Sequence, residues 1–209
     1  MATNTPIRTP ADAINASLTL MGYKRDVGSL FDGSEAAQKS LNVYAQTRDA
    51  LLHKFDYDWA QSTVVLSLLK TGLSTGYFPP TPWDPVTYPP PGYMYSYAWP
   101  DDCLKVRLVK PAPLFVVNVD PQFYSFQIYN DNGYTPARRT IVSNVENAVM
   151  SYTRQVTNLQ DWEVSAVDLL IAEMTRGLAP VLLGLEGAKA AMATSDEPGK
   201  MATAEAENR

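Results

Sequence analysis

Cysteine and histidine are almost missing from this chain of 209 residues, which has one of each, Cys103 and His53. A single cysteine excludes an intramolecular disulfide and a zinc site made of several thiolates. A catalytic triad would need His53 as its base, and this residue stands between Leu52 and Lys54 late in a helical pattern. We interpret His53 as a surface residue. We therefore predict that the chain is not an enzyme and that it uses no cofactor and no metal.

Long apolar runs and runs of basic residues are missing too. No stretch approaches the roughly 20 apolar residues that span a bilayer, and the N-terminus lacks the apolar segment of a signal peptide. The net charge is −5, and the one adjacent basic pair is Arg138–Arg139, whose side chains would face opposite sides of a strand. We expect synthesis in a reducing cytoplasm, no membrane anchor, and no adhesion to nucleic acid.

Paired carboxylates are the catalytic groups that remain. Glycoside hydrolysis needs two acids about 5 to 10 Å apart, and the sequence places Asp101 beside Asp102 and Asp56 close to Asp58. The first pair follows Pro100 in a turn, where aspartate hydrogen-bonds its own backbone, and the second pair flanks a helix end. We favour these structural roles, and a wall-degrading enzyme is only the third hypothesis for this chain.

Helical patterns mark the beginning of the chain. Thr9 fits an N-cap and Pro10 the first helical position, and this short helix should end near Gly22. A second, longer helix is predicted from about residue 34 to Phe55, with one apolar face.

Another helical pattern marks the end of the chain. A long helix is predicted to begin at Asp161, with Trp162 on its apolar face and packed against the preceding long helix. Pro180 should kink this helix or mark its last turn. The Ala-rich segment beyond Gly187 should be a weak helix or a tail that gains order only against a partner.

Between these ends the pattern predicts strands. Apolar and β-branched segments separated by turn residues give six candidates: Ser62–Leu69, Leu104–Val109, Leu114–Val119, Ser125–Tyr129, Ala137–Ile141 and Ala148–Tyr152. We predict an α+β fold, a bundle of long amphipathic helices from both ends with a small antiparallel β-region inserted between them. The domains would be a discontinuous helical one, residues 1–60 and 155–209, and a β-rich inserted one, residues 61–154.

A proline-rich segment, Gly72–Pro91, interrupts the β-region with seven prolines. Proline fixes φ and removes a donor, so we predict an extended loop that projects from the sheet. Its aromatic side chains suit either a protein interface or sugar stacking, and we favour the interface. The candidate interface residues come from this region and from the tail: Trp83, Tyr88, Tyr93, Tyr95, Leu185, Ala188, Ala191 and Met192.

Four segments, in this order, resemble one known family: Ala13–Leu18 leading to a glycine, Phe55–Ala60, Tyr97–Val106 and Met150–Arg154. Tyr97–Val106 fits a central signature of aromatic, proline, acidic, small, leucine and basic residues. With the order helix, long helix, β-region, long helix and Ala-rich tail, the chain resembles the head-to-tail adaptors of short-tailed phages, the tail tubular protein A family. The resemblance covers about residues 10 to 190, and the proline-rich segment departs from it as an enlarged loop.

This resemblance implies a structural protein of the virion neck. Such adaptors form a twelve-subunit ring that joins the portal protein above to a tail nozzle or tube protein below. Their C-terminal helix docks on the portal, and the ring lines the DNA ejection channel. Twelve copies at −5 each would make a negative lumen along which genomic DNA slides without sequence-specific binding. The alternative hypothesis is a β-rich tail module that binds host-surface glycans.

Overall fold

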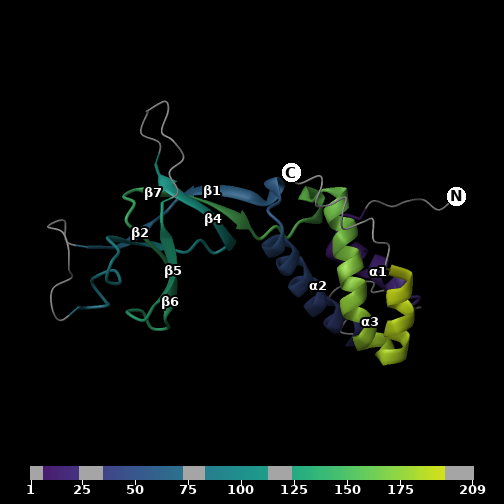
Figure 1. Ribbon diagram of the computed structural model, residues 1–209. Coiled ribbons are helices and arrows are strands. Elements are labelled where there is room, and N and C mark those ends of the chain that lie inside the picture. The colour runs from purple at the N-terminus through teal and green to yellow at the C-terminus, as the bar shows by residue number, and fades with distance from the viewer. Residues whose placement is uncertain (1–6, 24–34, 73–82, 113–123, 196–209) are drawn as a thin grey trace. The chain divides into compact units, whose positions relative to one another are not determined.

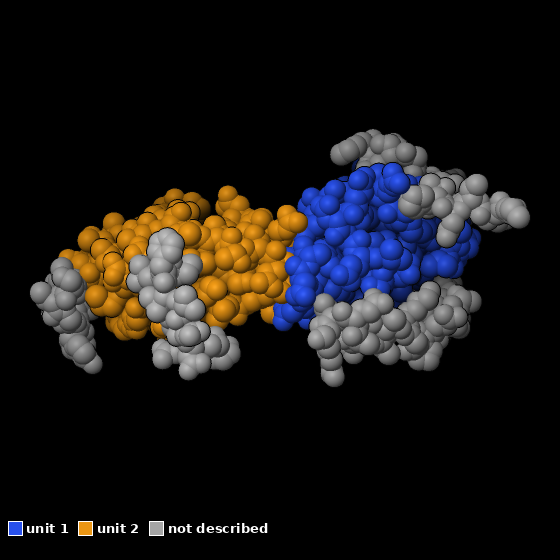
Figure 2. Space-filling model, turned by 90° about the horizontal axis from the view of Figure 1, so that it is seen from above, with its two compact units in different colours: residues 1–60, 155–209 blue, residues 61–154 orange. Residues whose placement is uncertain are grey.

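The computed structural model describes residues 7–23, 35–72, 83–112 and 124–195, and the side chains of these residues except 35, 36 and 185–195. The chain divides into two compact units, residues 1–60 with 155–209 and residues 61–154, which Figure 2 colours separately. In the described part of the chain, three α-helices belong to the first unit and seven strands to the second (Figure 1).

The first helix, α1 (Pro10–Leu20), begins where the sequence predicts. The Thr9 hydroxyl accepts a hydrogen bond from the Asp12 amide at 3.2 Å, and the Asp12 carboxylate accepts one from the Thr9 amide at 2.9 Å. This reciprocal pair satisfies two amides that the first helical turn leaves without partners. Gly22 follows the helix with a φ of +69°, a left-handed conformation that favours glycine. Both predicted ends of this helix are confirmed.

Helices α2 (Glu35–Lys54) and α1 both pack on α3 (Val164–Ser195). Small residues allow the close approach. The buried Ser17 hydroxyl of α1 donates to the Ile171 carbonyl of α3 at 3.3 Å, and a Cβ added at Gly177 of α3 would lie 3.0 Å from Val43 of α2. The core between the helices contains fully buried aliphatic side chains: Ile14, Leu18, Leu52, Leu170, Met174 and Leu178.

Helix α3 differs from its prediction at both ends. A short 3-10 helix, Leu159–Asp161, occupies the predicted start, and α3 itself begins at Val164. Pro180 lies within the helix, and the break comes at Gly184, where φ is 71° and ψ is 179°. Leu185, Ala188, Ala191 and Met192 follow this break, where side chains are not described. Residues 196–209, the last part of the predicted tail, lie outside the described residues.

Trp162 precedes α3, so its predicted place on that helix's apolar face is wrong. Its ring lies 4.9 Å from the ring of Trp59, centroid to centroid, and its indole nitrogen donates to the Val156 carbonyl at 3.2 Å. Trp59 in turn stacks on Tyr57 at 5.0 Å. These aromatic rings form a second part of the core beside the helices.

The second unit consists of two antiparallel sheets. The three-stranded sheet has the order β1-β7-β4, and the four-stranded sheet has the order β2-β3-β6-β5. The strand bounds are β1 Gln61–Val65, β2 Leu68–Thr71, β3 Tyr95–Ala98, β4 Cys103–Pro111, β5 Phe126–Asp131, β6 Arg138–Ser143 and β7 Ala148–Arg154. The predicted strand Leu114–Val119 lies outside the described residues.

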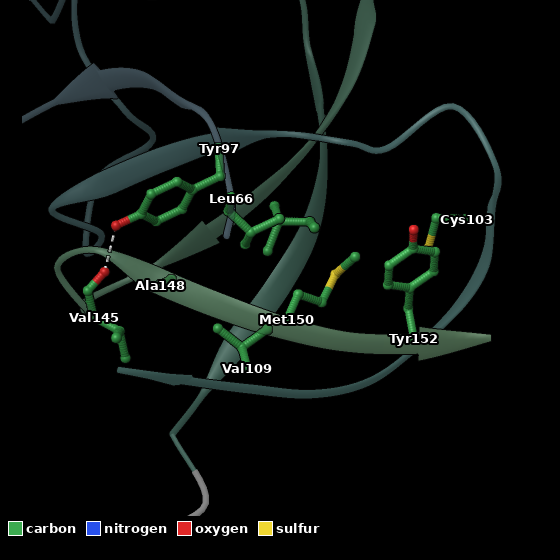
Figure 3. Close-up of a cluster of buried hydrophobic side chains, with 9 residues drawn as sticks. Leu66, Tyr97, Cys103, Val109, Val145, Ala148, Met150 and Tyr152 are labelled. Carbon is green, nitrogen blue, oxygen red and sulfur yellow. Dashed lines mark hydrogen bonds between the residues drawn. The ribbon is translucent and has the colours of Figure 1, made fainter. Parts of the chain in front are cut away.

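Buried side chains from both sheets form one core (Figure 3). Met150 on the central strand β7 and Val109 beside it on β4 are fully buried. Tyr97 from β3 packs with them, and its hydroxyl donates to the Val145 carbonyl at 2.6 Å, so its polar end is satisfied inside the core.

The predicted bundle of long helices with a small β-region is wrong. The part of the chain that the structure describes is a mixed α+β fold, with three α-helices and with seven strands in two antiparallel sheets. The predicted single strand Ser62–Leu69 is two strands in different sheets, because the chain bends at Leu66 and Ser67. The Leu66 amide donates to the carbonyl of Ala148, the first residue of β7, and the Ser67 carbonyl accepts from the amide of Ala98, the last residue of β3, each at 2.9 Å.

We predict that Trp162→Ala will lower the free energy of unfolding by about 3–5 kcal/mol, because it removes a large buried ring and leaves a cavity against Trp59. Val164→Ala is the matched control, since Val164 is 78% exposed two residues away and its loss should cost less than about 0.5 kcal/mol. Denaturant melts measure both values. Equal effects of the two changes would contradict the described packing.

Candidate functional site

Two of the predicted interface residues contact the four-stranded sheet or lie in it. Tyr95 on β3 is half-buried and packs against the core, with its ring 6.2 Å from that of Tyr97. Tyr93 precedes β3, and its hydroxyl donates to the Gln127 side chain of β5 at 3.0 Å. Both side chains therefore stabilise the sheet, and neither is a free aromatic platform.

The other two aromatics lie in a segment that folds on itself. Trp83 and Tyr88 are half-buried. The Trp83 indole donates to the Pro89 carbonyl at 2.9 Å, and the Tyr88 amide donates to the Asp84 carbonyl at 3.0 Å. The Asp84 carboxylate accepts hydrogen bonds from the Thr87 hydroxyl and the Val86 amide, which hold its pKa below the usual range. The segment is a compact turn.

This turn is attached to the four-stranded sheet through Lys70. The Lys70 ammonium donates to the Pro85 carbonyl and to the Asp131 carboxylate, and it lies 4.9 Å from the centre of the Tyr134 ring. We call these four residues, together with Gly133, the Lys70 clasp. The predicted projecting loop is therefore wrong for residues 83–91, because the clasp ties them to the sheet. Residues 73–82 lie outside the described residues.

Burial makes the Lys70 clasp a strong constraint. The Lys70 and Asp131 side chains are 3% and 2% exposed. Removing one partner of such a pair leaves a charge with neither water nor a counter-ion. The clasp also explains why position 133 is a glycine, because a Cβ there would overlap the Pro85 carbonyl. The amide of Gly133 donates to Asp131 Oδ1 at 2.9 Å, so Asp131 is held from both sides.

A second constellation occupies the segment that carries the family resemblance. Residues 99–102 join β3 in one sheet to β4 in the other. The Arg139 guanidinium of β6 lies 3.9 Å from the centre of the Trp99 ring, and the Trp99 indole donates to the Cys103 carbonyl at 3.1 Å. The Tyr152 hydroxyl of β7 donates to the Asp102 carboxylate at 2.9 Å. The signature is therefore a corner fastened to both sheets.

The candidate catalytic residues are dispersed. Asp102 belongs to this corner, whereas His53 is exposed in the last turn of α2 and Asp58 begins a 3-10 helix, Asp58–Ala60. Within the described ranges, no cluster of three or more His, Cys, Asp or Glu side chains has a metal-binding arrangement. In that same part of the chain, no helix combines the length and apolarity needed to cross a bilayer.

An open hollow lies on the helical unit between α2 and α3. Its volume is about 340 Å³, and its lining is mixed polar and apolar: Gln46, Thr47, Ala50, Leu51, Lys54 and Glu173. Sequence reasoning missed this hollow and the Lys70 clasp. Lys70 did give a signal, because it is the one charged residue between Asp58 and Asp84, but its partners are far away in sequence.

No protein-family model matches the chain, and no curated protein is significantly similar to it.

We predict that Lys70→Met will lower the free energy of unfolding by about 3–5 kcal/mol, because it leaves the Asp131 carboxylate buried without a counter-ion. Lys110→Met, at an exposed position on β4, is the control and should change stability by less than about 0.5 kcal/mol. Chemical denaturation monitored by tryptophan fluorescence measures both. A loss below about 1 kcal/mol for Lys70→Met would mean that water reaches the pair.

Cys103 gives a pH-dependent prediction. Burial raises the pKa of its thiol from the ordinary 9.0 to about 12, so the folded chain should resist alkylation at neutral pH and react only when it unfolds. The unfolded thiol ionises at lower pH than the folded one. This contribution to stability is therefore complete below pH 9.0 and is lost as the pH rises towards about 12. Iodoacetamide labelling with and without denaturant measures the protection, and rapid labelling of the folded chain would contradict it.

Proposed function

We propose that this chain is a structural head-to-tail adaptor of a phage virion, forming a ring that joins the portal protein to the tail and surrounds the DNA ejection channel. The observation that carries the proposal is the corner at residues 99–102. The residues on which the family resemblance depends join two sheets that build the same core. The segment that carries the resemblance therefore has a structural role in the β unit of this chain.

Charge distribution supports the same proposal. Residues 1–60 and 155–209 contain sixteen Asp and Glu against ten Lys and Arg, a net charge of −6, whereas residues 61–154 have six against seven, a net charge of +1. The acidity is therefore concentrated in the unit that contains the helices. Repeated around a ring, such a unit would repel DNA phosphates and favour sliding over adhesion.

The break in α3 supports a separate role for its C-terminal part. A glycine with a φ of 71° divides the helix at position 184, so the segment up to Ser195 takes its own direction. In the family that the chain resembles, the C-terminal helix is the part that binds the portal. The break at Gly184 separates this segment from the part of α3 that contributes Leu170, Met174 and Leu178 to the helical core.

We predict that truncation after Gly184 will leave a folded chain that no longer binds the portal protein encoded in the same genome. Truncation after Ser195 is the control, because it keeps the whole of α3 and should bind more strongly than the shorter form. Circular dichroism checks folding, and sedimentation with purified portal measures binding. Undiminished binding by the shorter form would contradict the assigned role. Saturable sugar binding without assembly would favour the glycan module instead.

A further inference from the structure

The turn between β5 and β6 contains Asn132–Gly133, the one Asn-Gly pair in the sequence. Asn132 is exposed, whereas its neighbour Asp131 is buried in the Lys70 clasp. Glycine is imposed here by packing, since any side chain would meet the Pro85 carbonyl. The clasp therefore places a chemically labile dipeptide in a turn that faces solvent.

Asparagine followed by glycine can modify itself. The backbone nitrogen of the glycine loses its proton and attacks Cγ of the asparagine side chain, forming a five-membered succinimide and releasing ammonia. Water then opens the ring at either carbonyl, giving aspartate or isoaspartate. Glycine allows this attack because it has no side chain to hinder the approach and few restrictions on its backbone angles. The reaction needs only water and a free, mobile amide.

In this structure the reacting amide is neither free nor mobile. The Gly133 N–H donates to Asp131 Oδ1 at 2.9 Å, and Oδ2 of the same carboxylate accepts from Lys70. A carboxylate acceptor holds the amide proton more strongly than water does and fixes the direction of the nitrogen. The carboxylate is itself fixed, because it is buried between Lys70 and the turn.

We propose that Asn132–Gly133 is a latent deamidation site that the Lys70 clasp keeps unreactive. Opening of the clasp frees the Gly133 amide, and the succinimide then forms as fast as it does in the unfolded chain. An isoaspartate product adds one methylene to the backbone beside Asp131 and a new negative charge in the turn. The Asp131–Arg138 pairing that ends the β5–β6 ladder would then be lost, and with it the support for the Pro85 segment. This inference does not depend on the adaptor function.

Peptide mapping by mass spectrometry of the full chain, aged at mildly alkaline pH, measures the conversion of Asn132. The folded wild-type chain should deamidate roughly tenfold or more slowly than the same chain in denaturant, the factor expected for one hydrogen bond to a charged acceptor. Folded Lys70→Met should approach the denatured rate, and Lys110→Met should match the wild type. Asn144, which precedes a valine, is the internal reference in every sample.

Two results would overturn the proposal. One is equal conversion of the folded and denatured wild-type chains, a comparison that needs no variant and holds even where Lys70→Met fails to fold. The other is slower conversion in folded Lys70→Met than in wild type, which would make Asp131 a base that promotes the attack. Hydrogen exchange at the Gly133 amide is an independent readout, slow in wild type and fast in folded Lys70→Met.

Discussion

The pairing of β7 with β1 on one side and β4 on the other is the constraint on which the rest of the structure depends. Gln61 lies opposite Thr153, so the chain enters and leaves residues 61–154 at the same end. Segments from both ends of the chain can therefore build one helical unit. Six of the seven residues of β7 are buried, so this strand lies at the centre of the β unit. It also pairs with β1, the first strand of the unit.

Local signals predicted the elements that local interactions determine. Thr9, Pro10 and Gly22 gave both ends of α1, because capping involves residues within one turn of each other. Strands β4 and β7 lie within two residues of the predicted bounds, because short apolar and β-branched segments bounded by turn residues are typical of strands. The central signature was also found from sequence, although its geometric role as a corner was not.

Long-range contacts determined what sequence reasoning missed. The bend at Leu66 and Ser67 depends on backbone partners in β7 and β3, and no local pattern shows it. Lys70, Pro85 and Asp131 come from three segments far apart in the chain. The sequence therefore predicted a projecting loop, whereas Lys70 links the Pro85 segment to the sheet. Pro180 was expected to kink α3 or mark its last turn, and the residue outside helical geometry is Gly184, four positions later, with a φ of 71°.

The Lys70 clasp and the corner at residues 99–102 connect parts of the β unit, and our central proposal is that the chain works as a component of an assembly. Native mass spectrometry of the full chain with the portal protein of the same genome tests this claim most directly. The account predicts a complex that contains several copies of the chain on each portal ring. A chain that stays in single copies beside an unoccupied portal would contradict it.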